Sequence, residues 1–452
     1  MSAPDRTSSR KLPATLSLTL SLSLPLTLTF SALAPLPTLP AQESKPQDPL
    51  LREERFHSGS IKARWRVDEN GNKNGAFLAW HENGLLQERA WYASGVLDGL
   101  HELFHQNGKL ALSEVKKAGI TDGKSSERNE DGTHEVRFPF VKGKLHGRVE
   151  ILDKGKITGT QEWKDGSLIT IDGSIAHPKP KDGIKSALAS IYGPDDPSGD
   201  AVGDTPTGAL QVLKAYRYLC DVPWTDLELD PQLNAHAAAA ASLCKRIGHL
   251  DHTPQNPGMP ESEYRFAFTG TSSSNLSVGS NLPGSVHSYM NDSDPSNIDR
   301  VGHRRWCLNP GMKRTGFGKD EAYSAMWSFD ESRTKIPDFE AICYPPRGYL
   351  PVRYFGPGHA FSVQLNPNKY RAPDITSTEI TVTPLDERYL RSGPPLAIEN
   401  EKAQNSGFGV RYCLIFRPRG IVVAPGARYL VEIKFVKEKP ARQSLRWLVE
   451  FY

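Results

Sequence analysis

The sequence predicts a multidomain protein: a ribbon of β-hairpin repeats, then a helix-containing domain, then a small C-terminal β-sandwich. The length of 452 residues corresponds to about three domains at roughly 100 to 200 residues each. A 24-residue glycine period marks the first region, and helical and then alternating apolar patterns mark the others. Lys and Arg (55) nearly balance Asp and Glu (52). That balance argues against nucleic acid as a partner.

Residues 1–41 have the features of a secretory signal peptide. Three basic residues come first, an apolar run follows from Leu16 to Ala34, and Ala41 is a small residue suited to cleavage. We therefore predict a secreted, periplasmic or cell-envelope protein. The run is also long enough to cross a bilayer. An uncleaved anchor is thus the alternative and would be the only membrane contact. Residues 42–60 are predicted to be a linker.

A glycine pair recurs every 24 residues in the next region, over residues 61–175. The pairs are Gly71 and Gly75, Gly95 and Gly99, Gly119 and Gly123, and Gly143 and Gly147. Between them the chain alternates, and Asn83-Gly84 and Asn107-Gly108 are hairpin-turn signals. Each unit is therefore expected to be a short hairpin that buries its apolar face by stacking on the next. These units resemble the MORN repeat in its bacterial YwqK-like variant. The resemblance implies a stacked β-ribbon for protein or envelope contacts, without catalytic residues.

Residues 176–206 are rich in Pro, Gly and Asp and are predicted to be a linker. Helical spacing begins at about residue 207, and a second helix is expected to start at Asp230-Pro231 and to stop at Gly248. Its five consecutive alanines, Ala237–Ala241, would let another layer approach closely. We assign residues 207–335 to one domain.

Two motifs follow these helices, GHLDHTP and VGHRRWCLNPGMKRTGFG. Together with the two helical segments before them, these motifs resemble, in this order, the CAP superfamily, the SCP domain of cysteine-rich secretory proteins, in its bacterial branch. The resemblance implies an α-β-α sandwich whose cleft presents two histidines, matched here by His252 and His303. In many members two glutamates complete a cation site. Asn275 fits the stretch around the first glutamate, but Ser274 stands where that glutamate is expected.

No residue matches the second glutamate, and the sequence does not assign the role to any of the nearby carboxylates, Asp292, Asp294 and Asp299. Zinc sites usually need at least three protein ligands, and two imidazoles alone bind weakly. His249 is the neighbouring histidine that could add a third ligand. We therefore predict no certain cofactor and at most weak binding of zinc through His252 and His303.

Catalytic residues stay unknown at this level. The hydroxyls of Ser272 to Ser274 lack a GxSxG turn that would position a nucleophile. Cys307 could face His303 only if both residues lay on one helix. The following Asn309-Pro310 is expected to end that helix near Trp306.

Residues 336–452 return to alternating apolar patterns separated by Pro- and Gly-rich turns, which predicts the small β-sandwich. Cys343 and Cys413 are the two cysteines of this module. If the exported protein forms a single disulfide, they are the first candidates.

The sequence favours binding over turnover. The predicted function is that of an exported interaction module whose ligand-binding cleft contains His252, His303, Asn275 and Ser274. Its partner would be an unidentified protein, lipid or envelope component, because fold analogy does not identify the ligand. Two alternatives stay open: a metal-dependent peptidase or esterase that uses the same cleft, and a purely structural envelope protein that uses the repeat ribbon.

Overall fold

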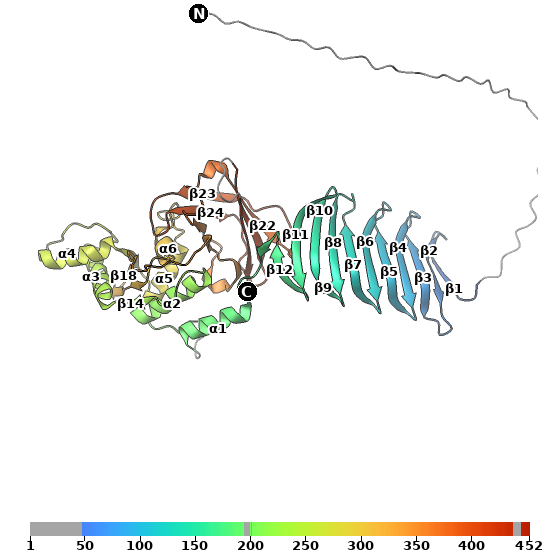
Figure 1. Cartoon of the computed structure of the whole chain (residues 1–452), viewed down its shortest axis with the longest axis horizontal. Coiled ribbons are helices and arrows are strands. Elements are labelled where there is room, and N and C mark those ends of the chain that lie inside the picture. Colours follow the sequence, from blue (N-terminus) through green and yellow to red (C-terminus); the bar gives the residue numbers. More distant parts are fainter. Residues whose placement is uncertain (1–47, 194–198, 200, 437–443) are drawn as a thin grey trace, which may run out of the picture. The chain divides into compact units, whose positions relative to one another are not determined.

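A computed structural model describes residues 48–193, 199, 201–436 and 444–452 (Figure 1). The predicted signal peptide lies outside these residues. In the described ranges no helix is long and apolar enough to cross a membrane. The predicted linker 42–60 differs from the structure, because strand β1 (Leu51–Arg55) falls inside it and pairs with β2. Its charged sequence LREER lacks the apolar alternation by which a strand is recognised.

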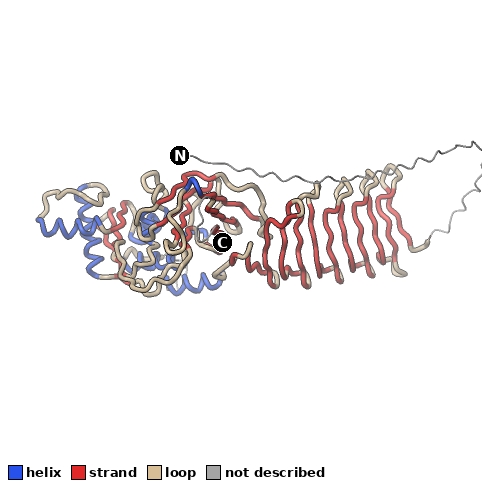
Figure 2. Tube along the Cα trace, turned by 45° about the horizontal axis from the view of Figure 1, so that its top comes forward, coloured by secondary structure: helices blue, strands red, loops and turns tan. Residues whose placement is uncertain are grey.

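The repeats form one antiparallel sheet in which each long strand pairs with its neighbours in sequence (Figures 1 and 2). The sheet continues from β1 through β2 (Ile61–Val67), β3 (Lys73–Trp80), β4 (Leu86–Ala93), β5 (Val96–Phe104), β6 (Leu110–Lys117), β7 (Ile120–Arg128), β8 (His134–Val141), β9 (Lys144–Leu145), β10 (Gly147–Asp153), β11 (Lys156–Lys164), β12 (Ser167–Ile171) and β13 (Ser174–Ile175). This arrangement confirms the expected strand hairpins.

Hydrogen bonds between successive turns repeat with the same period. The His81 ring nitrogen Nε2 donates to the Phe104 carbonyl at 2.9 Å, and His105, 24 residues later, donates to the Arg128 carbonyl at 2.9 Å. Gly84 has a φ of 80°, in the left-handed region that a glycine adopts without strain. Each turn is therefore stabilised by the turn that follows it.

His101 of β5 lies between two carboxylates on the neighbouring strands. Its Nε2 is 3.2 Å from Glu88 Oε1, and its Nδ1 is 2.9 Å from Glu114 Oε1. Glu114 also accepts a hydrogen bond from the Thr121 hydroxyl and pairs with Lys116. The hydrogen bond to Glu88, and then the one to Glu114, raises the pKa of His101, while burial opposes the increase.

We expect the centre of the repeat sheet to be less stable in alkaline solution, because His101 then loses its charged interaction with Glu88 and Glu114. A raised folded-state pKa means that the stabilisation is fully present below about pH 6.5 and is lost as the pH rises through the raised value. The loss should be under about 1 kcal/mol, since the site is partly exposed. Hydrogen exchange of β4–β6 amides, corrected for intrinsic rates, should report it.

The pH dependence should disappear in His101→Gln. His146→Gln is the matched control, because His146 pairs with Asp165 in an exposed part of the same sheet. Equal protection of β4–β6 at pH 6 and pH 8 in the unmodified chain would refute the prediction.

The middle region combines helices with short strands (Figure 2). Its elements are α2 (Pro206–Leu219), β14 (Glu228–Leu229), α3 (Pro231–Ile247), α4 (Glu261–Ser272), β15 (Ser274–Val278), α5 (Leu282–Asn291), α6 (Gly302–Cys307), β16 (Arg314–Thr315), β17 (Phe317–Asp320) and β18 (Tyr323–Trp327). Strands β15, β18 and β17 form a three-stranded antiparallel sheet in that order, and β14 pairs with β16.

Helix α3 begins and ends where the sequence predicts. The Asp230 carboxylate caps its first turn by accepting from the Gln232 amide at 2.8 Å, and Gly248 closes it with a φ of 78°. Strand β17 packs closely against the five alanines of α3, as the sequence predicts. A Cβ placed on Gly318 of β17 would lie 2.0 Å from the Ala238 nitrogen, so only glycine allows this contact.

The C-terminal region is strand-rich, as predicted. Its two four-stranded sheets have the orders β19-β21-β24-β23 and β20-β26-β25-β22. The strands are β19 (Ala341–Tyr344), β20 (Gly348–Leu350), β21 (Phe361–Leu365), β22 (Thr378–Leu385), β23 (Ile398–Gln404), β24 (Tyr412–Pro418), β25 (Arg428–Phe435) and β26 (Ser444–Phe451), with short 3-10 helices η1 (Val352–Tyr354) and η2 (Ile375–Ser377).

A helix lies inside the predicted linker 176–206. Helix α1 (Lys181–Tyr192) buries Ile184, Leu188 and Ile191 in the main hydrophobic core. These residues have helical spacing, but Pro- and Gly-rich stretches on both sides conceal it in the sequence. The linker prediction is therefore wrong for this helix.

The predicted boundary at residue 335 does not divide the hydrophobic core. One continuous cluster extends from Ile184 of α1 through α2, α5 and α6 of the middle region to Phe451 of β26. Buried Arg304 of α6 reinforces the junction by donating to the Ala360 carbonyl at 2.8 Å and to the Ser362 hydroxyl at 3.0 Å. The middle and C-terminal regions therefore stabilise each other.

The predicted disulfide is wrong. Cys343 of β19 pairs with Val363 of β21, which pairs with Leu414 of β24, so Cys413 lies two strands away and one residue out of register. Strand spacing then separates the two cysteines by roughly 10 Å and places them on opposite faces. A disulfide needs Cα atoms within about 7 Å. All five cysteines are buried free thiols.

Candidate functional site

A cleft of about 350 Å³ contains all four residues that the sequence analysis singled out. The middle region supplies most of its lining. The residues are His252, Ser272, Ser274, Asn275, Asn297, Arg300, Gly302, His303, Trp306, Phe329 and Phe408. The last of these comes from the C-terminal region, over 100 residues beyond His303.

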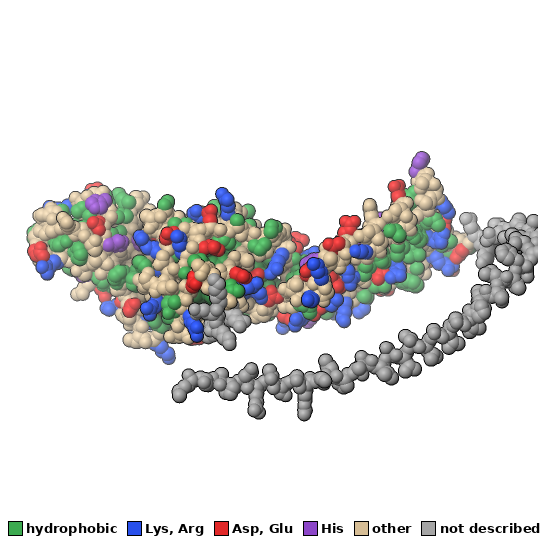
Figure 3. Space-filling model, turned by 90° about the horizontal axis from the view of Figure 1, so that it is seen from above, with side chains coloured by type: hydrophobic (Ala, Val, Ile, Leu, Met, Phe, Trp, Pro, Cys, Tyr) green, Lys and Arg blue, Asp and Glu red, His purple; other side chains and the backbone are tan. Residues whose placement is uncertain are grey.

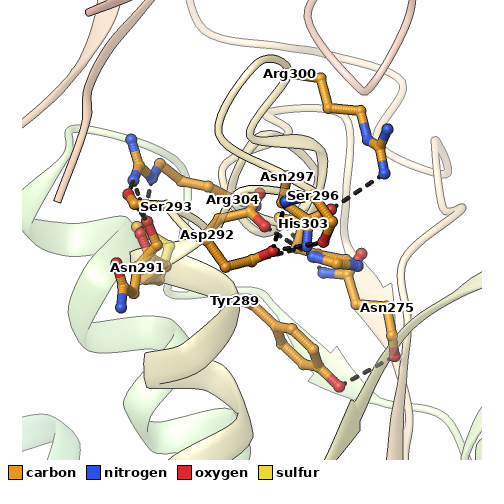
Figure 4. Close-up of polar contacts among 12 residues, drawn as sticks. Asn275, Tyr289, Asn291, Asp292, Ser293, Ser296, Asn297, Arg300, His303 and Arg304 are labelled. Carbon is orange, nitrogen blue, oxygen red and sulfur yellow. Dashed lines mark hydrogen bonds and ion pairs between the residues drawn. The ribbon is translucent and has the colours of Figure 1, made fainter. Parts of the chain in front are cut away.

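His303 is held in the first turn of α6 by an aspartate at the end of α5. Its Nδ1 donates to Asp292 Oδ1 at 2.8 Å, and the other carboxylate oxygen accepts from the Arg304 amide at 3.2 Å (Figure 4). The Asp292 side chain is 1% exposed, whereas that of His303 is 21% exposed. The carboxylate therefore fixes the ring from behind and leaves Nε2 as the nitrogen without a proton when the ring is neutral.

His252 is held in a similar way by a backbone carbonyl. Because a carbonyl can only accept, Nδ1 of His252 carries the proton and donates to the Thr271 carbonyl at 2.9 Å. The centroids of the His252 and His303 rings lie 6.4 Å apart, with the rings tilted by 36°. The two histidines thus have the same tautomer and a lone pair on each Nε2.

Asn275 and Ser274 have different environments in the cleft. The Asn275 amide donates to the His303 carbonyl at 3.0 Å, and its backbone carbonyl accepts from the Tyr289 hydroxyl at 3.1 Å. These bonds make Asn275 a positioning residue for α6. The buried Ser274 hydroxyl has no hydrogen-bond partner among the described residues.

The cleft does not fit a structural or catalytic zinc site. Among the described residues, no group of three or more His, Cys, Asp and Glu side chains could hold a metal ion. His249 does not line the cleft, and its exposed Nδ1 lies 3.0 Å from the Ile247 carbonyl. Asp292 is already engaged by His303. Two imidazoles remain, fewer than the usual number of zinc ligands.

Neither the Cys307 thiol nor the Ser272 hydroxyl is arranged for catalysis. The Cys307 side chain is fully buried, 3.6 Å from the Asn275 amide nitrogen and 3.9 Å from the Met326 sulfur. Burial raises the pKa of the Cys307 thiol, which disfavours the reactive thiolate. The Ser272 hydroxyl donates to the Thr269 carbonyl at 3.3 Å, so it is not activated by either histidine.

Sequence reasoning missed the roles of Asp292 and Phe408. Asp292 was one of three unassigned carboxylates, and the fold places it at the end of α5, where it accepts from His303. Phe408 offered no signal, because nothing in its local sequence relates it to a helix more than 100 residues earlier.

Comparison with known families supports the CAP superfamily for the middle of the chain. Residues 222–327 match the family model described as CAP, Cysteine-rich secretory protein family. No curated protein matches the chain. The match includes His252 and His303 and ends before Phe329 and Phe408, so part of the cleft wall lies outside the matched domain.

Proposed function

We propose that this chain is an exported interaction module of the CAP type, with the cleft around His252 and His303 as its binding site. The observation that carries the proposal is the donor set of the cleft: two oriented imidazoles, without a third metal ligand or an activated nucleophile among the described residues. Such a set can bind a ligand through hydrogen bonds but supplies little for hydrolysis.

We also propose that the repeat sheet, with its likeness to MORN repeats, makes contacts to a protein, lipid or envelope component. Exposed apolar side chains on the sheet support this role, among them Trp91 at 54% and Ile120 at 53% exposure. Figure 3 shows hydrophobic side chains gathered over the repeat sheet beside Lys and Arg. Contiguous apolar surface of this kind is typical of interaction sites.

Zinc should bind weakly at most. In calorimetric titration at about pH 7.5, where imidazole is mostly neutral, we expect no sub-micromolar site and no zinc-dependent hydrolysis of peptides or esters. His252→Ala/His303→Ala tests whether any residual binding belongs to the cleft. His249→Ala is the matched control, because His249 lies outside the lining. Sub-micromolar binding that only the double variant abolishes would favour the metal-dependent hydrolase instead.

Export should leave a mature chain that begins at Gln42. Intact mass spectrometry of the protein recovered outside the cytoplasm should show this N-terminus, because the basic start, the apolar run and Ala41 form a signal-peptide pattern. Recovery of a membrane-bound species that retains residues 1–41 would support the anchor and contradict cleavage.

A further inference from the structure

We propose that the C-terminal region completes the cleft and that the cleft binds a flat apolar molecule bearing a carboxylate. The proposal rests on the binding function above and names its ligand class. It follows from three features of the lining: its aromatic rings, the way in which one of these rings is fixed, and a cationic side chain to which no carboxylate of the described residues pairs.

Three aromatic side chains supply the apolar part of the cleft. The ring centroids of Trp306 and Phe329 lie 4.4 Å apart, and Phe329 is 50% exposed although it is large and apolar. Phe408 is the third ring of the lining. Flat aromatic surfaces favour a flat partner, because offset stacking adds to the burial of apolar area.

Phe408 is fixed in place from α6. The Arg305 guanidinium donates to the carbonyls of Ser406 at 2.7 Å and Val410 at 2.9 Å, on either side of Phe408, and lies 5.0 Å from its ring. A Cβ on Gly302 would lie 3.1 Å from the Phe408 ring. The loop that carries Phe408 is thus tied to the helix that carries His303, and the cleft is built jointly by both regions.

The polar groups of the cleft suit an anion. Arg300 is the one Lys or Arg side chain in the lining, which contains no Asp or Glu. Its Nη2 donates to the neutral Asn297 amide oxygen at 3.2 Å, and in the described ranges no carboxylate pairs with it (Figure 4). A carboxylate would give the guanidinium an anionic partner, and charge-assisted bonds to arginine are strong.

The size of the cleft limits the ligand. A volume of about 350 Å³ lies near the lower end of small-molecule pockets. It suits one flat group with its carboxylate, not an extended chain. Two sources share this chemistry, a free aromatic acid and the C-terminal aromatic residue of a peptide.

The test measures binding to the full mature chain by calorimetry. The probes are 2-naphthoate, its uncharged counterpart 2-naphthylmethanol, the peptide Gly-Gly-Phe and its C-terminal amide. The variants are Phe408→Ala and Arg300→Gln. Their matched controls are Phe266→Ala and Arg265→Gln, which alter an exposed ring and an exposed arginine of α4 outside the lining.

We expect at least one of the two acids to bind about tenfold more tightly than its uncharged counterpart. Phe408→Ala and Arg300→Gln should each weaken it about tenfold, while the controls leave it unchanged. Binding of naphthoate identifies a free acid as the source, and binding of the peptide acid alone identifies a peptide terminus.

Equal binding of acid and uncharged probe, indifference to Phe408→Ala, or no binding of any probe would each overturn the proposal. These variants leave His252 and His303 intact. The outcome of the zinc titration is therefore independent of the outcome of this test.

Discussion

A chain that ends at residue 335 is expected not to fold in its helical region, although the CAP match ends at residue 327. Helices α2, α5 and α6 share their core with the strands that would be lost. Leu213 of α2 and Tyr289 of α5 belong to the same buried cluster as Phe416 and Phe451. Each large buried side chain contributes about 1.5–3 kcal/mol. Without the strands, the helical members of the cluster lose this burial, and the loss from several of them exceeds the roughly 5–15 kcal/mol that stabilises a domain.

Near-ultraviolet circular dichroism and urea unfolding should detect this loss, with the full mature chain as the reference. The truncated chain should lack a cooperative transition and the fixed aromatic signal. A truncated chain with a native-like cooperative transition would mean that the middle region is an independent domain, as its sequence alone suggests.

Replacing Arg304 with leucine is expected to destabilise the same unit by about 3–5 kcal/mol. The fully buried guanidinium donates to the carbonyls of Met290 at 2.7 Å and Ala360 at 2.8 Å, and lies 4.5 Å from the Tyr344 ring. Burial lowers the pKa of Arg304. Leucine fills part of the volume but leaves these buried carbonyls unsatisfied, and each such group costs about 1–3 kcal/mol.

Urea unfolding of the full chain, followed by tryptophan fluorescence, should show the change as a lower transition midpoint at constant slope. Arg265→Leu provides the control, since Arg265 forms only an exposed ion pair with Glu261 and should change stability by less than about 0.5 kcal/mol. If both variants unfold at the same urea concentration, the buried arginine does not hold the two regions together.

Local features of the fold were predictable and non-local ones were not. The hairpin period and the limits of α3 follow from turn glycines and from caps such as Asp230 and Gly248, which act within a few residues. Helix α1 was missed because flanking prolines and glycines outweighed its short apolar stripe. The core shared across residue 335 has no local signature, since it joins side chains that are distant in sequence.

The same distinction applies to the site. Motif order singles out His252 and His303 in the sequence, and the structure places both in the lining of one cleft. The partner of His303 was not assigned, because three carboxylates were near in sequence and the fold decides that Asp292 is the one that contacts it. The predicted disulfide between Cys343 and Cys413 is wrong for a related reason. Strand register and strand order decide whether Cys343 and Cys413 meet, and neither is written in the spacing of the cysteines.

The neighbour-to-neighbour pairing of the repeat sheet has a consequence for how this protein can diversify. Duplication of one 24-residue unit would insert two strands, and these would pair only with the strands on either side. The sheet would lengthen by about 10 Å, while the contacts of β7, β8, β11 and β12 with the C-terminal region stayed the same. Gene copies of this chain should therefore tolerate gain or loss of whole 24-residue hairpins between β3 and β6. Insertions of other lengths should be selected against, because they would interrupt the hydrogen bonds that join successive turns.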